Sequence, residues 1–554
     1  MKKIIIFFIA LSAVFFFLGK ELNPLDPHFF SFHDNTQAAR MQEFALNLKS
    51  GIIPPRLAPN FSFQHGFPVF NFYAPFVYWM GGLFQLFGLS AVLSLKLVLF
   101  FGLFASFISF FLFSSVFFGF WGGILGASVY SSSLWMAVEI FVRGNVGEVW
   151  FMALLPLALY LLIKNDSANK RPLFLFSCIT LSFLFTVHNV LSLVSIIFIA
   201  AYSLGLKHKK RALISLVLGL LLSSYFLIPA IIENRLTYAS EIASRTKYAD
   251  HFLCVWQLWK ANSWSFGGSG VGCMNDDMSF QIGKIHILLA AIGIGLFFLA
   301  LRKRGKKKEL FIPFFILGTT LFTAFLTISA SKPVWDLFSP LMSVFQFPWR
   351  FLPFVVFGVA YFVSRIPSEL ANKRIEIISS IILSLILLFS SSKFFSRPWK
   401  YTLDEYKSMF LTDKYVQQKA AYEIPEYFPQ YGDYAKWRTY DTSSNGFGKN
   451  YLNYKINKPF IKEIITEEKT ITLPIHYFPF WEIYVNGKKT VPENFDTLGR
   501  PFLSDLPPHS DIVVRYNETP DEKTSNVITL ITLITLMTVI TNKKLWKKVN
   551  TILQ

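Results

Sequence analysis

Apolar stretches long enough to cross a membrane recur along this chain, and they limit its fold more than any other feature. Runs of about 20 mostly apolar residues, the length that a bilayer-spanning helix needs, follow one another from Ile4 to Phe389, and one more occupies residues 526–541. Hydrophobic residues make up 53% of the 554 positions and charged residues 16%, which is too apolar for a soluble enzyme of this size. The sequence therefore predicts a mainly α-helical, polytopic membrane protein.

Basic residues gather in short segments between the apolar stretches. The net charge of +19 would suit nucleic-acid binding, but this distribution is the positive-inside pattern of membrane proteins. The first apolar stretch begins like a signal peptide, yet no small-residue cleavage site follows it, so we expect a retained anchor. We assign to the cytoplasm the basic segments at Lys2 and Lys3 and at residues 164–171, 207–211, 302–308, 373–374 and 543–548.

The basic segments also set the number of crossings, because the chain must cross an even number of times between two cytoplasmic segments. This parity predicts about twelve spans in the plasma membrane, with both termini in the cytoplasm. Residues 76–88 are expected to form a short aromatic helix at the outer interface. The predicted spans are residues 4–20, 92–114, 117–138, 149–163, two short spans within 172–206, and residues 212–232, 284–301, 310–329, 351–366, 375–391 and 526–541.

The loops divide the chain into three parts. Residues 1–391 form the helical membrane domain, whose long first external loop is residues 21–91. Residues 392–524 are soluble in composition, and apolar and polar residues alternate in KTITLPIHYF and WEIYVNGKK, with a hairpin turn expected at Asn486-Gly487. This pattern predicts an external β-sandwich after a helical lead-in. Residues 525–554 supply the last span and a basic tail.

The three cysteines do not have the spacing of a zinc site. Cys178 is expected inside a span. Cys254 and Cys273 share one external loop, where they form either a disulfide, if the compartment is oxidising, or two free thiols.

Asp34 is the first candidate functional residue. Its loop is far longer than a connection between helices requires, and the aromatic, Pro and Gly residues downstream suit a groove for a lipid headgroup. An external carboxylate there can deprotonate an acceptor hydroxyl or hold a divalent cation. The alternative is that Asp34 caps a helix that begins near Thr36. Asp26, in the same loop, is a second acid but is typical of a turn.

Two further polar groups lie at the outer ends of predicted spans. In IFVRGNVGEVW, Arg143 is suited to phosphate and Glu148 to a proton or a metal, whereas the alternative is a structural ion pair between them. His188, in FTVHNVLS, is either a ligand or a hydrogen-bonded structural residue.

Arg350 lies in SVFQFPWRFLPF, at the start of a predicted span. Trp349 and Arg350 are ordinary anchors for a membrane boundary. Charged residues on the same side favour a site instead, and these are Glu233, Arg235 and Arg245.

The sequence contains no P-loop, GxGxxG fingerprint, HExxH helix or GxSxG elbow. These absences argue against nucleotide-driven transport, dinucleotide chemistry and the corresponding hydrolases. Nucleotide sugars are cytoplasmic, so an external site favours a lipid-linked donor.

Six motifs, taken in order, resemble one family. They are FHD in the first loop, GFPVFNFYAPF, VRGNVGE, the VHN turn, QFPWRFLPF and HYFPFWEIYVNGK, and they extend over nearly the whole chain. By their order and spacing the chain resembles a prokaryotic membrane-protein family labelled 6-pyruvoyl-tetrahydropterin synthase-related, and it is similar to YfhO-like proteins. No pterin-synthase domain or zinc histidine triad is discernible, so the label implies no pterin chemistry.

The resemblance implies a GT-C type glycosyltransferase that uses a polyprenyl-phosphate sugar as donor and an external glycan, lipid or polymer as acceptor. In such enzymes an acid in the first external loop is the catalytic base or the partner of Mg²⁺ or Mn²⁺, and by position this acid is Asp34. Asn35 follows it, where some protein mannosyltransferases have an adjacent Asp-Glu pair, so the requirement for a metal stays open. Contacts with the substrate are expected for His33, Arg143, Glu148, His188 and Arg350.

Two other functions compete with an inverting glycosyltransferase. A transporter or lipid-carrier flippase would place polar residues near the bilayer midplane and would have broken, repeated helices, whereas the ionisable residues here lie at the outer ends of spans. A non-catalytic envelope scaffold would use the β-sandwich to bind a surface polymer.

Overall fold

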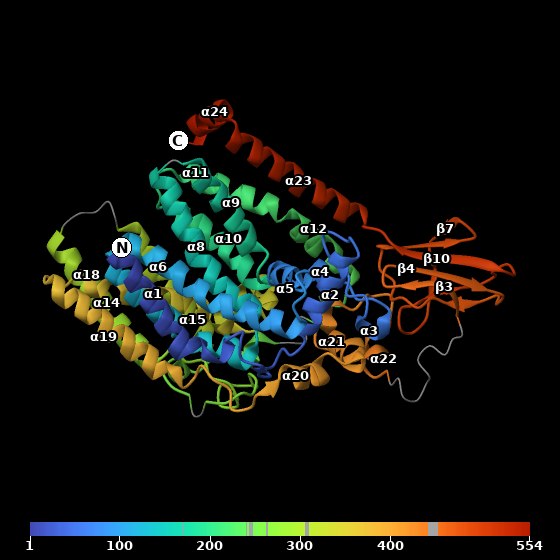
Figure 1. The fold of residues 1–554 in the computed structure, drawn as a ribbon, viewed down its shortest axis with the longest axis horizontal. Coiled ribbons are helices and arrows are strands. Elements are labelled where there is room, and N and C mark those ends of the chain that lie inside the picture. Colours follow the sequence, from blue (N-terminus) through green and yellow to red (C-terminus); the bar gives the residue numbers. More distant parts are fainter. Residues whose placement is uncertain are drawn as a thin grey trace.

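The computed structural model describes residues 1–554 except 169, 240, 243–246, 262–263, 305–309, 441–451 and 554. Arg245 and part of the basic segment at 302–308 therefore lie outside the described residues. A large helical body carries a smaller β-sheet region at one end (Figure 1). This architecture matches the predicted mainly helical membrane protein with a β-rich C-terminal part.

Seven described helical segments are long and apolar enough to cross a membrane. Two further helices, α11 (Lys209–Leu222) and α12 (Ser224–Ile232), meet at a bend of 66° and count as an eighth segment if they form one span. The helical chain continues from α12 to Leu236. The seven segments are α1 with η1 and η2 (Lys2–Leu22), α6 (Ala91–Ser131), α8 (Val146–Ala168), α14 (Lys284–Arg304), η9 with α18 (Pro348–Ser368), α19 (Lys373–Ser392) and α23 (Pro520–Thr541).

Seven or eight described segments thus compare with twelve predicted spans, and two features of the helices account for the difference. Three of the predicted spans are the helices α9 (Arg171–Phe185), α10 (Asn189–Ser203) and α15 (Phe311–Thr327), which have only 15, 15 and 17 residues. A helix needs about 20 residues to cross the hydrocarbon core. Two further predicted spans, 92–114 and 117–138, largely share the long segment α6. The short helix expected at 76–88 is α5 (Phe76–Leu86), with 11 residues.

The segment α6 is a hairpin of two helices rather than one straight rod. The Phe110 and Tyr130 rings stack with their centroids 4.5 Å apart, whereas a straight helix would separate residues 20 positions apart by roughly 30 Å. The reversal occurs at Gly119, whose φ of 70° and ψ of −172° belong to a region that only glycine adopts readily. Two antiparallel apolar helices therefore occupy residues 91–131, as the separate predictions 92–114 and 117–138 require.

The basic segments lie together at one end of the helical body. Arg211 donates to Asn550 Oδ1 at 2.6 Å and Arg171 donates to the Ile540 carbonyl at 2.8 Å. Lys3 lies over the Phe120 ring beside the α6 reversal. Figure 1 shows the N-terminus and the basic helix α24 (Lys543–Leu553) on the side away from the sheets. This arrangement is the one that the positive-inside pattern predicts, with the β-sheet region at the other end.

Two antiparallel sheets form the β-sheet region. The larger has the strand order β3-β4-β10-β6-β7 and the smaller β5-β9-β8. Val485 pairs with Lys488, so Asn486-Gly487 is the two-residue turn predicted from the sequence, and both residues have positive φ. The strands are β3 (Asn453–Lys458), β4 (Ile461–Thr466), β5 (Ile471–Thr472), β6 (Trp481–Val485), β7 (Lys488–Thr490), β8 (Asn494–Phe495), β9 (Pro501–Leu503) and β10 (Ser510–Tyr516).

Short helices connect α19 with the sheets and pack on the first loop. They are α20 (Leu403–Phe410), η10 (Tyr415–Lys419), α21 (Ala420–Tyr422), η11 (Pro425–Tyr427) and α22 (Tyr434–Arg438). The first loop itself carries α2 (Gln37–Lys49), α3 (Phe61–Gln64), α4 (Val69–Phe72) and α5. A short pairing of β1 (His28–Phe29) with β2 (Tyr401–Thr402) joins the two segments.

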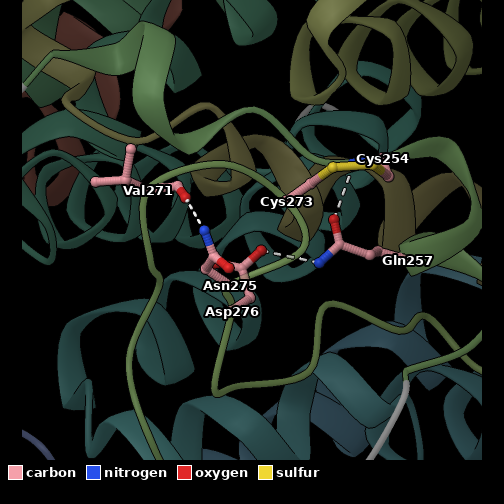
Figure 2. The surroundings of a disulfide bond; sticks show 6 residues. All are labelled: Cys254, Gln257, Val271, Cys273, Asn275 and Asp276. Carbon is pink, nitrogen blue, oxygen red and sulfur yellow. Dashed lines mark hydrogen bonds between the residues drawn. A yellow bond between two sulfur atoms is a disulfide. The ribbon is translucent and has the colours of Figure 1, made fainter.

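Cys254 and Cys273 are joined by a disulfide (Figure 2). Gln257 accepts from the Cys254 N–H at 2.8 Å and donates to Asp276 Oδ2 at 2.9 Å. Of the two alternatives that the sequence leaves open, the structure contains the disulfide, while Cys178 is free and buried in α9.

Replacing Gly119 by alanine tests the α6 hairpin. We expect Gly119→Ala to lower the free energy of unfolding by about 1–3 kcal/mol, because a Cβ is strained at this φ and ψ. Gly295→Ala, inside α14 with no atom within 4 Å of the new Cβ, is the control and should be neutral or stabilising. Thermal unfolding in detergent compares the variants, and equal unfolding temperatures would contradict the hairpin.

Candidate functional site

The segment before α2 is fixed on the end of η3 (Val138–Arg143) by main-chain hydrogen bonds. His33 N–H donates to the Val142 carbonyl at 2.9 Å, and Asp34 N–H donates to the Arg143 carbonyl at 3.1 Å. Two motifs that lie more than 100 residues apart in the sequence, FHD and VRGNVGE, are therefore in direct contact. The structure brings the two strongest predicted site segments together.

The Asp34 carboxylate contacts side chains and is about one quarter exposed. Its Oδ1 accepts from Thr36 Oγ1 at 2.5 Å, and its Oδ2 accepts from Gln37 Nε2 at 2.7 Å and from Arg40 Nη1 at 3.0 Å. Helix α2 begins at Gln37 with Thr36 at the N-cap, and among the described contacts no backbone N–H donates to this carboxylate. The alternative interpretation of Asp34 as a side-chain helix cap is therefore wrong.

Arg40 holds this carboxylate from inside the protein. Its side chain is 1% exposed, and its guanidinium lies over the Tyr73 ring, 4.6 Å from the centroid. An acid and a π-face both stabilise a buried guanidinium, and Arg40 has both. The pair orients the Asp34 carboxylate while part of it stays open to solvent.

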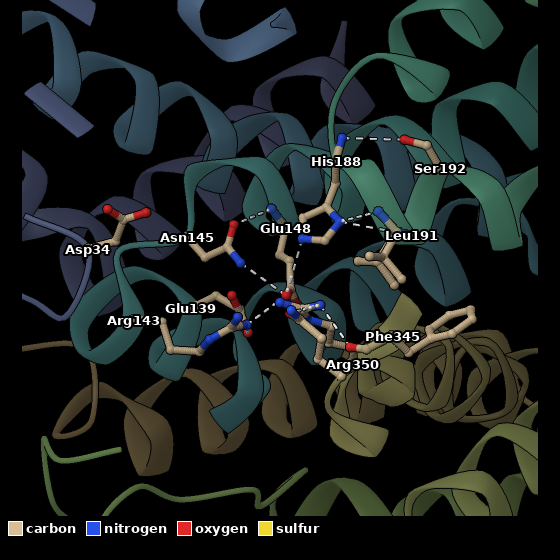
Figure 3. Close-up of polar contacts among 12 residues, drawn as sticks. Asp34, Glu139, Arg143, Asn145, Glu148, His188, Leu191, Ser192, Phe345 and Arg350 are labelled. Carbon is tan, nitrogen blue, oxygen red and sulfur yellow. Dashed lines mark hydrogen bonds and ion pairs between the residues drawn. The ribbon is translucent and has the colours of Figure 1, made fainter. Parts of the chain in front are cut away.

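A second charged cluster surrounds Arg143 (Figure 3). Arg143 Nη1 donates to Glu139 Oε1 at 2.5 Å and to Glu148 Oε1 at 2.7 Å, and both glutamates are completely buried. Asn145 also donates to Glu148 Oε1 at 3.0 Å, and His188 Nε2 lies 3.5 Å from the same oxygen. The structural ion pair considered for Arg143 and Glu148 is thus present, with Glu139 as a third member that the sequence analysis missed.

Arg350 differs from Arg143 in its partners. It donates to the Phe345 carbonyl at 2.8 Å and to Gln346 Oε1 at 3.3 Å, and it lies 5.1 Å from the Phe347 ring centroid. None of its hydrogen-bond partners in the described part of the chain is a carboxylate, and its buried Nε has no partner. Glu148 and Arg143 act on it electrostatically, so it belongs to the same site, although its described hydrogen bonds go to uncharged groups.

Glu426 joins this site from the C-terminal region. It lies in η11 and is partly exposed, and burial raises the pKa of its carboxyl, while Arg40 and Arg350 act in the opposite direction. Asp34, Glu426 and Arg350 also act electrostatically on Tyr73, whose ring centroid lies 4.6 Å from the Arg40 guanidinium. No motif in EIPEYFP marks Glu426, and only the docking of the C-terminal region reveals it.

His33 and His188 have ordinary hydrogen-bond partners. His33 Nε2 lies 3.1 Å from the Phe266 carbonyl, and burial lowers the pKa of its imidazole. His188 is the N-cap of α10, and its Nδ1 accepts from the N–H groups of Val190 and Leu191 at 3.2 Å each. The structural alternative for His188 is therefore present in the fold, and a substrate contact for either histidine stays a prediction.

The residues around Asp34 do not suit a resident divalent cation. Mg²⁺ and Mn²⁺ favour several oxygen ligands, usually carboxylates and waters. Asp34 is instead paired with a guanidinium, and within the described ranges no three His, Cys, Asp or Glu side chains gather into a metal site. The nearest positive charge to the Asp34 carboxylate among its described hydrogen-bond partners is the Arg40 guanidinium.

Comparisons with known proteins leave the family open. No family model matches the chain, and no curated protein matches it, so the resemblance to the pterin-labelled and YfhO-like proteins stays a prediction. One similar solved structure is an Archaeoglobus fulgidus oligosaccharyltransferase crystallised with Zn and sulfate, with a TM-score of 0.34 and 12% identity. The match covers 69% of this chain and 52% of that one, so the chain spans about half the length of that protein. Fold and site together define a multi-helix membrane protein with a charged site at one end of the helices.

Glu43 supplies a pH test of the loop that carries Asp34. This fully buried side chain in α2 accepts from Asn60 N–H at 2.8 Å and Asn60 Nδ2 at 2.9 Å. Burial raises the pKa of Glu43 from 4.5 to about 7, although the two hydrogen bonds act against it. A carboxyl with a raised pKa binds its proton more tightly in the folded state, so its contribution to stability is full below pH 4.5 and is lost as the pH rises to 7.

We expect the wild type to lose about 3 kcal/mol of stability from Glu43 between these two pH values. Glu43→Gln cannot ionise and should unfold with a smaller difference between pH 5 and pH 8. The exposed Glu423→Gln is the control and should keep the wild-type difference. Thermal unfolding in detergent at the two pH values measures it, and an unchanged difference in Glu43→Gln would refute this assignment.

Proposed function

We propose that this protein is an inverting glycosyltransferase that moves a sugar from a polyprenyl-phosphate donor to a hydroxyl group on the external face of the membrane. The observation that carries the proposal is that Arg143 links two unlike groups, because its carbonyl accepts from the Asp34 N–H and its guanidinium lies 4.5 Å from the ring centroid of Trp349, the neighbour of Arg350. One group is the partly exposed carboxylate of Asp34, held by Arg40, and the other is Arg350, whose described hydrogen-bond partners are all uncharged. A base and a cation suit such a transfer.

An apolar surface next to Arg350 supports a lipid-linked donor. The short helices α16 (Lys332–Leu337) and α17 (Ser339–Met342) precede it, and their large side chains are not covered by the rest of the chain. Leu337 is 75% exposed, Leu341 is 57% exposed and Val344 is 45% exposed. In a membrane protein such side chains meet lipid, so a polyprenyl tail can lie there while its phosphate reaches Arg350.

The transfer can be written with the residues present. Asp34 accepts the proton of the acceptor hydroxyl, and the hydroxyl oxygen forms a bond to the anomeric carbon of the donor sugar. The bond from this carbon to the phosphate oxygen breaks on the opposite face, which inverts the configuration. The polyprenyl phosphate leaves with the bonding electrons, and Arg350 stabilises its added negative charge.

The roles of the other charged residues follow from their partners. Arg143 is already neutralised by Glu139 and Glu148, so we assign it to holding the Asp34 segment through its carbonyl. Arg40 orients the base. This division predicts activity without an added metal, since cationic side chains balance the phosphate.

Replacing Asp34 tests the base. A strain that lacks the protein is complemented with wild type or Asp34→Asn at equal membrane levels, and envelope glycans and glycolipids are compared by mass spectrometry. We expect a sugar to disappear in the deletion and to return with wild type, while Asp34→Asn lowers the rate by roughly 10²–10⁴-fold.

Asp26→Asn is the matched control, because Asp26 lies in the same loop and the described hydrogen bonds of its carboxylate all go to its neighbour His28. It should restore the sugar. Full rescue by Asp34→Asn would refute the proposal and favour the transporter or the scaffold.

Replacing Arg350 tests the phosphate contact. Arg350→Gln should lower transfer by roughly 10²-fold or more, because one charge that stabilises the leaving phosphate is removed. Arg350→Lys should recover part of the activity, since lysine keeps the charge but loses the planar geometry. Arg365→Gln is the control on the same helix, where Arg365 pairs with Glu369 at 2.7 Å. Equal activity of Arg350→Gln and Arg365→Gln would contradict a role in phosphate binding.

A further inference from the structure

A polar cavity of about 110 Å³ lies beside α2, outside the charged site. A single water needs roughly 10–15 Å³ of this kind of space, so the cavity has room for a larger group. The side chains around it come from α2, from the start and end of α3 and from the segment of η10. They are Gln42, Asn60, Gln64, Asp413, Val416 and Gln417.

The chemistry of the lining is that of a site for hydroxyl groups. Four of the six side chains are amides, each of which can both donate and accept, as a hydroxyl group does. The lining contains one carboxylate and no lysine or arginine, so it offers no complement to a phosphate. Within the described part of the chain, the side chains of Gln42, Gln64 and Gln417 make no hydrogen bond. Their amide groups can therefore donate to a ligand and accept from it.

Asn60 is oriented from behind by a buried acid. Its backbone N–H and its Nδ2 both donate to Glu43, and this arrangement leaves its side-chain carbonyl for the cavity. The amide is therefore fixed before any ligand arrives, which lowers the entropic cost of binding.

The backbone on the opposite wall is strained. Ser62, Phe63 and Gln64 have φ values of 51°, 65° and 63°, a left-handed conformation that side chains other than glycine adopt at a cost. Residues from the C-terminal part of the chain hold it, because Trp437 Nε1 in α22 donates to Ser62 Oγ at 2.7 Å and His476 Nε2, between β5 and β6, lies 2.6 Å from the same atom. This strained turn places Gln64 on the cavity.

The cavity and the proposed base are built on the same helix. Helix α2 carries Arg40, which binds Asp34, and two residues later it carries Gln42 of the lining. Residues two positions apart on a helix lie on different faces, so the cavity and the carboxylate lie on different sides of α2. An acceptor that reaches both therefore needs more than one sugar unit.

We propose that this cavity binds an uncharged, hydroxyl-rich sugar unit of the acceptor, while another unit of the same acceptor extends to Asp34. The inference rests on the proposed function and adds to it the class of the acceptor. It distinguishes a glycan or glycolipid acceptor from a protein or phosphate acceptor, because neutral amides match neutral hydroxyl groups.

Saturation-transfer NMR on the purified full-length protein in detergent tests the binding directly. The probes are the methyl glycosides of glucose, galactose, mannose and N-acetylglucosamine. We expect at least one to give a signal with wild type. The double variant Gln42→Ala/Gln417→Ala should bind it roughly tenfold more weakly, because two hydrogen-bonding side chains are lost. Asp413→Ala, an exposed position that cannot disturb the core, should weaken it as well.

Gln430→Ala is the control, since Gln430 is an exposed amide of the same region away from the cavity. Its binding should equal that of wild type. Absence of a signal with all four probes, or equal binding by the double variant and the control, would overturn the inference.

Failure of the inference and failure of the proposed function give different results. Asp34→Asn should keep the NMR signal while it loses transfer in the complemented strain. If Asp34→Asn abolishes transfer but the cavity variants bind and complement normally, only the acceptor site is wrong. If Asp34→Asn supports transfer, the proposed function is wrong whatever the cavity binds.

Discussion

Buried hydrogen bonds to the first loop hold the two parts of this protein together. Asn71 Nδ2 donates to Glu233 Oε2 at 2.9 Å and to Glu522 Oε1 at 2.6 Å, and Thr519 Oγ1 donates to Glu233 Oε1 at 2.5 Å. All four side chains are buried, where a polar group without a partner costs several kcal/mol. The loop, the end of α12 and the start of α23 therefore have to occupy one arrangement, and the position of the charged site depends on it.

Two arginines of the charged site have different surroundings. Arg143 and Arg350 both lie at helix ends with tryptophan nearby, and Arg143 lies 4.5 Å from the Trp349 ring centroid. Two buried glutamates form ion pairs with Arg143, whereas the described hydrogen bonds of Arg350 go to a backbone carbonyl and a side-chain amide. The difference comes from Glu139, one turn before Arg143, and it follows from the local geometry of η3 rather than from the motif.

The sequence predicted the broad architecture well and the site in part. Long apolar stretches and clusters of basic residues predicted the helical body. Alternation of apolar and polar residues, with the turn at Asn486-Gly487, predicted the β-sheet region. Both predictions succeed because these patterns are local in the sequence. Composition predicted a span at α10, although this helix has only 15 residues. Asp34 was recognised by its place in a long loop, whereas Glu426 was not, because nothing local distinguishes it from an ordinary surface acid.

The sequence by itself therefore determined that this is a membrane protein and which segments of the chain are apolar or charged. A helix in the bilayer must satisfy its own backbone hydrogen bonds and present an apolar surface, and a single segment meets both requirements. Only the tertiary structure decided which charges pair with one another, that Arg40 donates to Asp34, and that amides from α2, α3 and η10 meet in one cavity. Such contacts join residues hundreds of positions apart, and electrostatic and hydrogen-bond energies depend on distances that no local pattern contains.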